Sequence, residues 1–206
     1  MKLKQVYIFL LFLFFPYLLC GQQVFSLSGG VNLPQVMRNS SSPYLSVGAD
    51  FKTSYAISFD YVKYTGKHFG LGTSLDYVNT TADLAITTGS HLVVSNTDSV
   101  FYKLGFLNIS ILPGYRWGEK VQFFVQAGAY FGFLTNTNND ANSNIQQTDM
   151  GLAGVLGLRI PVGKQMGLVL KNSYTYGFGK KYKDAGDLTA LNIMFLGGIY
   201  YALNKN

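Results

Sequence analysis

Cysteine and charged residues are scarce in this chain of 206 residues. Cys20 is the single cysteine and lies in the N-terminal apolar segment, so the rest of the chain can form neither a disulfide nor a thiolate metal site. Charged residues make up only 13% of the chain, and its formal net charge of +6 comes from basic residues interspersed with acidic ones. This balance gives no electrostatic reason to expect a nucleic-acid partner.

Long hydrophobic runs are also missing. After the N-terminal segment, no run reaches the roughly 18 apolar residues that a membrane-spanning helix requires. The mean hydropathy is nevertheless +0.17, and the chain contains 15 Tyr, 16 Phe and 23 Gly. An apolar chain without spanning helices that is rich in aromatic residues and glycine is typical of a membrane β-barrel, in which alternation hides the apolar face.

The first 21 residues have the features of a secretory signal peptide. Lys2 and Lys4 precede an apolar core, which gives way to polar residues at Gln22. A core of about 15 residues is too short to cross a membrane as a helix. Cys20 also allows a lipoprotein interpretation, but such signals place a small residue before the cysteine, whereas Leu19 is large. We predict a cleaved signal peptide at residues 1–21 and a barrel domain at residues 22–206.

The stretch from Leu107 to Leu134 contains two alternating runs joined by a polar turn at residues 118–120. Apolar and aromatic residues share one face of these runs, at Leu107, Ile109, Ile111, Pro113, Tyr115, Trp117, Val121, Phe123, Val125, Ala127, Ala129, Phe131 and Phe133. Polar residues and glycine occupy most of the other face, which is the period of two that a strand imposes. Membrane strands need about 9 to 11 residues, and both runs are that long. The stretch therefore predicts a membrane-spanning β-hairpin.

Similar runs predict eight strands, at residues 25–33, 45–61, 69–77, 100–117, 121–134, 150–160, 166–176 and 191–203. The connections alternate between long polar loops, at 34–44, 80–99, 136–148 and 179–187, and tight turns, at 65–68, 118–120 and 163–165. A soluble β-sandwich would instead have shorter strands and turns of similar size at both ends. The sequence predicts an all-β fold, namely an eight-stranded antiparallel up-and-down transmembrane β-barrel of the bacterial outer membrane, with both termini in the periplasm.

A family resemblance is carried by three segments: LNISILPGYRW with FFVQAGAYFGFL, DMGLAGVLGLRIPVG with MGLVLKNSYTYGF, and the closing LNIMFLGGIYYAL. Over residues 22–203 the chain resembles the PorT-type outer-membrane β-barrel family, whose small barrels are related in architecture to OmpA and OmpX. The resemblance implies a small integral barrel. The named member of this family is associated with type IX protein secretion, but no residue motif of this chain carries that role.

Charged residues on the inward faces of the strands form a candidate site in the lumen: Asp60, Asp76, Arg116, Asp149, Arg159 and Lys171. This balanced set suits either an ion-conducting lumen or a plug of side chains. We favour the plug, with Arg159 paired to a carboxylate across the lumen, because eight strands leave an interior only wide enough for side chains. Asn172 is a polar exception on an outward face, where an aliphatic or aromatic residue is expected.

Aromatic residues at outward positions predict girdles at the two membrane interfaces. The predicted set is Tyr61, Tyr115, Trp117, Tyr174, Tyr176 and Tyr201. From these girdles we expect the barrel to contact outer-membrane lipids and lipopolysaccharide. A basic run in the last loop also suits contact with lipopolysaccharide phosphates, at Lys180, Lys181 and Lys183.

Two functions fit the sequence. The first, which we favour, is a non-enzymatic barrel that is structural or binds other envelope proteins through long external loops. The second is an enzyme that modifies the acyl chains of lipid A, in which the loop residue His91 would act as the base. Serine and acidic residues lie near it in sequence, at Ser90, Ser95 and Asp98. The asparagine-rich stretch 136–144 has too few carboxylates for calcium, and we expect no metal and no cofactor.

Overall fold

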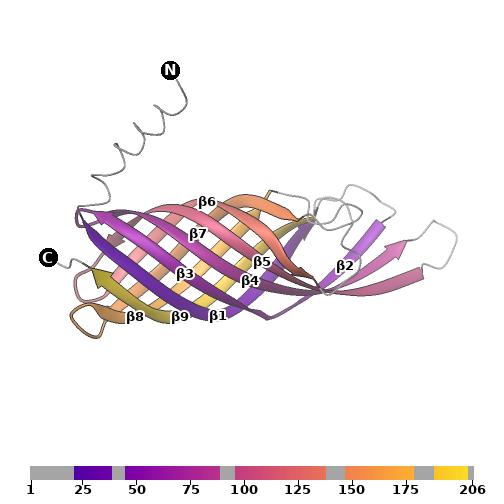
Figure 1. Ribbon diagram of the computed structural model, residues 1–206. Helices are drawn as coiled ribbons and strands as arrows, with labels where there is room; N and C mark the ends of the chain where they lie inside the picture. The colour runs from indigo at the N-terminus through magenta and orange to yellow at the C-terminus, as the bar shows by residue number, and fades with distance from the viewer. Residues whose placement is uncertain (1–20, 39–44, 89–95, 138–146, 179–187, 204–206) are drawn as a thin grey trace, which may run out of the picture.

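Alternating side chains and paired backbones build a closed barrel in the computed structural model, which describes residues 21–38, 45–88, 96–137, 147–178 and 188–203 (Figure 1). The strands are β1 (Gln22–Arg38), β2 (Leu45–Lys52), β3 (Ser54–Thr65), β4 (Phe69–Thr88), β5 (Asn96–Trp117), β6 (Gln122–Thr137), β7 (Thr148–Pro161), β8 (Met166–Gly177) and β9 (Leu188–Leu203). Because β2 and β3 are two segments of one interrupted strand, eight strands form the wall. The predicted eight-stranded antiparallel barrel is confirmed.

Backbone pairing closes the wall into a ring. β1 pairs with β9, with Gln23 opposite Leu203, and β4 pairs with β5, so no barrel strand is left at an edge. The start of β1 and the end of β9 therefore lie at one end of the barrel, which we call the turn end because the tight turns at Gly66 and Gly118 lie there too (Figure 1). These glycines have φ of 84° and 92°, a left-handed conformation that other residues adopt only with strain.

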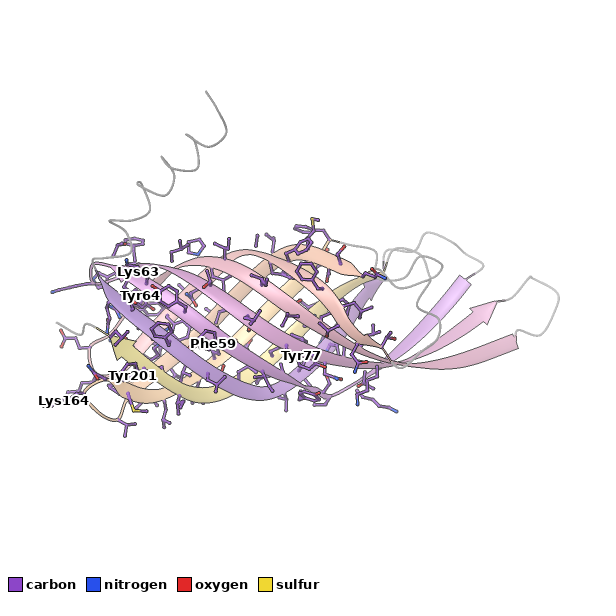
Figure 2. The ribbon with its side chains drawn as sticks, viewed as in Figure 1. Phe59, Lys63, Tyr64, Tyr77, Lys164 and Tyr201 are labelled. Atoms are coloured by element: carbon purple, nitrogen blue, oxygen red, sulfur yellow. The ribbon has the colours of Figure 1, made fainter. Side chains whose placement is uncertain are left out.

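The two faces of the strands differ as the alternation predicts. In β5, Ile109 and Ile111 are 47% and 58% exposed, whereas Asn108 and Ser110 are buried. Apolar side chains project outward all along the wall (Figure 2). Soluble proteins rarely expose apolar patches of this extent, whereas a lipid bilayer solvates them. No helix among the described residues has the length and apolar character needed to cross a membrane.

β1 is longer than predicted. We expected a loop to begin at Pro34, but β1 continues to Arg38, and Pro34 pairs with Asn192 of β9. That prediction was wrong because proline is excluded chiefly from strands that are paired on both sides. The pairing of β1 with β3 ends at Asn32, so Pro34 lies where β1 has β9 as its single partner among the described strands.

The polar stretch at residues 80–99 is not the long loop that we expected. β4 continues to Thr88 and β5 begins at Asn96, directly opposite it. β2 pairs with the same part of β4, so three strands extend past the barrel rim (Figure 1). We call this extension the projecting sheet, and it consists of residues 45–52, 81–88 and 96–103. The prediction was wrong because a sheet outside the bilayer has both faces in water and can be polar, while its threonines favour strands.

The strand predicted at residues 45–61 is interrupted at Thr53. β2 and β3 both pair with β4, but their registers differ by one residue, since Lys52 lies opposite Thr81 and Ala56 lies opposite Val78. Irregularities of this kind bend a strand and increase its local twist. The interruption coincides with the point at which the wall of the barrel gives way to the projecting sheet.

Side chains hold the backbone together at this interruption. The carbonyl oxygen of Asn79 in β4 accepts hydrogen bonds from Ser54 Oγ and, at 2.9 Å, from Asn32 Nδ2 of β1. A buried carbonyl without a strand partner would cost free energy comparable to a lost hydrogen bond, so these two donors stabilise the break.

The remaining connections confirm the predicted turns and shorten the predicted loops. Turns occupy residues 66–68, 118–121 and 162–165, while β6 extends to Thr137 and β7 begins at Thr148. Most of the loops predicted at 136–148 and 179–187 lie outside the described residues. The same is true of residues 1–20 of the predicted signal peptide.

We predict that Gly30→Ala hinders barrel closure whereas Gly29→Ala does not. A Cβ atom at Gly30 would collide with the backbone oxygen of Phe195 at the seam between β1 and β9, whereas a Cβ at Gly29 would meet nothing closer than the Ala56 oxygen at 3.7 Å. Such overpacking costs about 1–3 kcal/mol. Unboiled samples on SDS gels, taken after a urea series, should show the folded band of Gly30→Ala vanishing at lower urea. Equal urea midpoints for the two variants would contradict the role of this seam.

Candidate functional site

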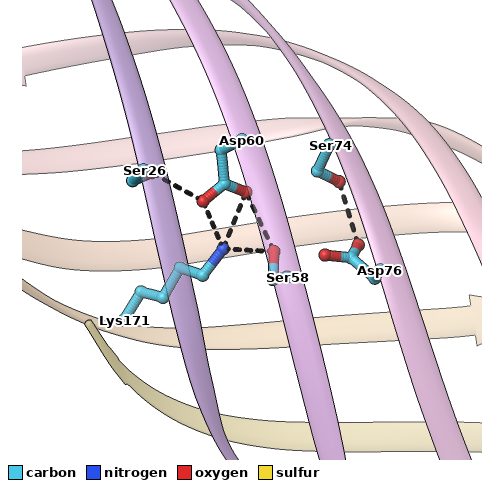
Figure 3. Close-up of polar contacts among 6 residues, drawn as sticks. All are labelled: Ser26, Ser58, Asp60, Ser74, Asp76 and Lys171. Carbon is cyan, nitrogen blue, oxygen red and sulfur yellow. Dashed lines mark hydrogen bonds and ion pairs between the residues drawn. The ribbon is translucent and has the colours of Figure 1, made fainter. Parts of the chain in front are cut away.

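An ion pair spans the interior near the middle of the barrel. Lys171 of β8 places Nζ 2.7 Å from both carboxylate oxygens of Asp60 on β3, two strands that are not neighbours (Figure 3). The ammonium also donates to Ser58 Oγ at 2.7 Å, and Ser26 Oγ donates to Asp60 Oδ2 at 2.7 Å. The Lys171 and Asp60 side chains are 3% and 12% exposed, so water screens the pair weakly. We call Asp60 and Lys171 the central ion pair.

Hydroxyl groups hold two further acids. Asp76 on β4 accepts a hydrogen bond from Ser74 Oγ at 2.9 Å and lies beside the central ion pair (Figure 3). Asp149 on β7 accepts a hydrogen bond from the Tyr130 hydroxyl at 2.8 Å. Both side chains are buried, as the inward positions of the two aspartates require. Hydrogen bonds from hydroxyls offset part of the cost of removing a carboxylate from water.

Two arginines meet a tyrosine at the turn end of the lumen. Arg116 lies over the Tyr64 ring, with Cζ 3.7 Å from the ring centroid, and donates to Gln22 Oε1 at 2.5 Å. Arg159 donates to the Tyr64 hydroxyl at 2.6 Å and lies 4.4 Å from the centroid of Phe124. Aromatic faces and neutral oxygens therefore stabilise both guanidinium groups. We call Tyr64, Arg116 and Arg159 the arginine–tyrosine cluster.

The predicted pairing of Arg159 with a carboxylate was therefore wrong. Inward parity correctly predicts that Arg159 is buried. Parity does not determine the height of a side chain in the lumen or the strand that it faces. The sequence analysis also missed Tyr64 and Phe124, because aromatic residues in a barrel sequence suggest the lipid face. Their positions carried a usable signal, since Tyr64 shares the inward parity of Asp60 and Phe124 that of Gln126.

Amides and hydroxyls fill the lumen on the other side of the central ion pair. Asn192 Oδ1 of β9 accepts a hydrogen bond from Thr80 Oγ1 of β4 at 3.5 Å, and these two strands are not neighbours. Asn192 Nδ2 donates to Thr175 Oγ1 of the adjacent strand β8 at 3.2 Å. Together with the central ion pair and the arginine–tyrosine cluster, these contacts connect strands across the lumen at three levels. The arrangement supports the prediction of a plug of side chains rather than that of an open ion pathway.

The predicted girdle residues lie on the outer surface in two groups. The turn end carries Tyr61, Tyr115, Trp117 and Tyr201, and the strand β8 carries Tyr174 and Tyr176 nearer the opposite end. Aromatic neighbours extend both groups, with ring centroids 5.9 Å apart for Trp117 and Phe123 and 5.8 Å apart for Tyr176 and Phe178. The predicted girdle did not include these phenylalanines, although they share the outward parity.

The chain has two histidines, and the structure describes His68 but not His91, the residue proposed for enzymatic chemistry. His91 and its neighbours Ser90 and Ser95 lie outside the described residues. His68 stacks on Tyr115 at a centroid distance of 5.2 Å, and its Nδ1 lies 2.9 Å from the Arg116 carbonyl oxygen, which is a structural contact at a turn. Within the described ranges, no three His, Cys, Asp or Glu side chains gather in a way that suits a metal ion.

We predict that Lys171→Met destabilises the barrel by roughly 3–5 kcal/mol, because it leaves Asp60 charged and without its counter-charge in a buried site. Adding Asp60→Asn to the same chain should recover part of that loss, since the cost arises from the unpaired charge. Urea unfolding of the refolded protein in lipid vesicles, followed by Trp117 fluorescence, measures both. Leu170→Met on the outer face of the same strand is the control. Strictly additive losses for the two substitutions would contradict the ion pair.

We also predict that the purified protein shows little steady conductance in planar lipid bilayers, because side chains connect the walls at three levels of the lumen. Single-channel recording after reconstitution measures this, with detergent buffer alone as the control. Large and stable open levels in the wild-type protein would contradict the plug.

Comparison with solved structures shows related folds. The chain is similar to OprG from Pseudomonas aeruginosa, with a TM-score of 0.57 and 11% identity over 89% of this chain and 96% of that chain. For Neisserial surface protein A the TM-score is 0.49, with 12% identity over 88% of this chain and 97% of that chain. For outer membrane protein W of E. coli the TM-score is 0.45, with 12% identity over 89% of this chain and 98% of that chain. These low identities concern the fold alone, and the OprG comparison is the one that supports it. No curated protein is significantly similar in sequence.

A sequence family supplies the remaining evidence. The profile of the family described as outer membrane protein beta-barrel domain matches residues 22–183, which is most of the chain. The match begins where β1 begins and includes the residues of the central ion pair and the arginine–tyrosine cluster. The chain therefore belongs to the outer membrane protein beta-barrel domain family and is an integral protein of the bacterial outer membrane.

Proposed function

We propose that this protein is a non-enzymatic barrel that binds an extended polypeptide segment outside the cell through the projecting sheet. The observation that carries the proposal is the unpaired edges of that sheet. Among the described strands, residues 45–51 of β2 pair only with β4, and residues 96–102 of β5 also pair only with β4, because β6 joins β5 from Leu104 onward.

An unpaired strand edge presents a row of backbone N–H and C=O groups. An extended peptide matches that row by adding one more strand, which is a recurring mode of peptide recognition. The eight barrel strands have no such edge, since every one has a partner on both sides over the wall. Recognition is thereby concentrated at the end of the molecule opposite the turns.

The proposal implies an orientation. Tight turns and both ends of the barrel domain face the periplasm, and the projecting sheet faces the medium, as in other outer-membrane barrels. The aromatic girdle residues anchor the barrel at the two interfaces, and lipopolysaccharide surrounds the outer half of the wall. A signal peptide at residues 1–21 and PorT-type membership belong to the same proposal, which supposes export to the envelope.

A filled lumen supports binding over transport. The central ion pair and the arginine–tyrosine cluster occupy the space through which a solute would pass. A barrel with a filled lumen and a projecting sheet with open edges is suited to hold a partner at the cell surface. The partner class is an envelope or extracellular protein with an exposed, extended segment.

We predict that removal of the projecting hairpin abolishes partner capture and leaves the barrel folded. Residues 84–100 are replaced by Asn-Gly, which joins the paired residues Asp83 and Phe101 through a two-residue turn. Capture is measured by crosslinking in native outer membranes with a photoreactive residue placed in β2. A matched control replaces the opposite turn at residues 163–165 with another tight turn. Partner capture by the truncated protein, with normal heat-dependent gel mobility, would contradict the proposal.

The substitution His91→Ala distinguishes the enzymatic alternative from the proposed binding function. A binding barrel keeps partner capture in this variant, and mass spectra of lipid A from matched strains stay the same. A change in lipid A acylation that depends on His91 alone would replace the binding function with an enzymatic one.

A further inference from the structure

Asn172 lies on the lipid-facing surface near the middle of β8. Its neighbours in register are Leu156 of β7 and Phe195 of β9, which are 52% and 50% exposed on the outer wall. Leu170 and Tyr174, the next outward residues of the same strand, are also exposed. Asn172 is therefore a primary amide within an apolar surface, between the two groups of girdle residues on the outer wall.

The side-chain oxygen of Asn172 lacks a hydrogen-bond partner within the described part of the protein. Its Oδ1 is shielded by the surrounding side chains and accepts no hydrogen bond. Lipid tails offer neither donors nor acceptors, so an unpaired amide at this depth costs free energy. Polar side chains inside the membrane commonly mark sites of interaction, where a second molecule supplies the missing hydrogen bonds.

A shallow groove of about 620 Å³ adjoins this amide on the outer wall. Its lining includes Trp117, Phe123, Leu158, Leu170, Asn172 and Gly197. A Cβ atom at Gly197 would meet only the Leu170 side chain, at 3.4 Å, so packing within this barrel does not require glycine there. Because Gly197 has no side chain, another backbone or side chain can approach the strand closely there, as happens at small residues where membrane segments pack together.

We propose that a second copy of this chain packs against this face, with the Asn172 side chains of the two copies hydrogen-bonded to each other. Two barrels inserted in the same direction and related by a twofold axis must have that axis along the membrane normal. Every residue near the axis then meets its own copy at the same depth.

An amide suits self-pairing because it carries both a donor and an acceptor. Each Asn172 Nδ2 can donate to the Oδ1 of the other copy, and rotation of the terminal torsion brings either atom to the surface at little cost. An acyl chain in the groove would leave the Asn172 Oδ1 atom unpaired. The inference is independent of partner capture by the projecting sheet, which lies at the end of the barrel.

Cysteine crosslinking tests whether Asn172 lies at a twofold axis. A disulfide requires Cα atoms within about 7 Å, so Asn172→Cys in a Cys20→Ser background should give a crosslinked dimer upon mild oxidation in native membranes. The control is Leu75→Cys, since Leu75 is a lipid-facing residue on β4, diametrically opposite β8 in the ring. No more dimer from Asn172→Cys than from Leu75→Cys would overturn the proposal.

Dilution in lipid vesicles tests the role of the amide. Energy transfer between labelled copies should show that Asn172→Leu weakens dimerisation about 3- to 30-fold, the range expected for hydrogen bonds between membrane segments, while Asn172→Gln keeps most of it. The Asn172→Leu barrel should keep its heat-dependent gel mobility, since leucine is an ordinary lipid-facing residue. Wild-type protein that is monomeric at every dilution, or that retains a lipid in place of a second copy in native mass spectra, would overturn the proposal.

Discussion

Hydrogen bonding of the backbone in lipid is the constraint on which this structure depends. No water reaches the N–H and C=O groups within the bilayer, so each group must pair with a neighbouring strand. The ring from β1 round to β9 meets this demand, and the seam at Gly30 and Phe195 shows how closely the two ends must approach. Closure also explains why outward alternation suffices for the lipid face, since no strand edge has to be covered.

Closure creates a narrow interior that must satisfy its own polar groups. Inward side chains there have little water to bind, so their charges pair with whatever the fold brings within reach. Lys171 reaches Asp60, whereas Arg116 and Arg159 are held by the ring and hydroxyl of Tyr64. Cation–aromatic contacts and hydroxyl groups thus take the place of some of the carboxylates that a count of charges suggests.

The requirement that every backbone group pair with a neighbouring strand ends at the barrel rim. Beyond Thr53 the strands β2, β4 and β5 continue as a sheet with open edges, because water can pair with backbone groups that lipid cannot. Asn32 and Ser54 secure the transition by donating to the Asn79 carbonyl. The wall therefore anchors the protein in the membrane, and the projecting sheet is available to bind a partner. Asn172 is the exception, a polar group that the wall places in lipid.

The sequence by itself determined the β-barrel class, the tight turns, the lipid and lumen faces of the strands in the wall, and the burial of all six charged lumen residues. It could do so because a period of two assigns each side chain of the wall to lipid or lumen. Only the tertiary structure decided which inward side chains meet. Pairing across a lumen depends on strand tilt and on the register of non-adjacent strands, so Arg159 lies against Tyr64. It also decided where strands end, since polarity at residues 80–99 is equally suited to a loop and to a sheet in water.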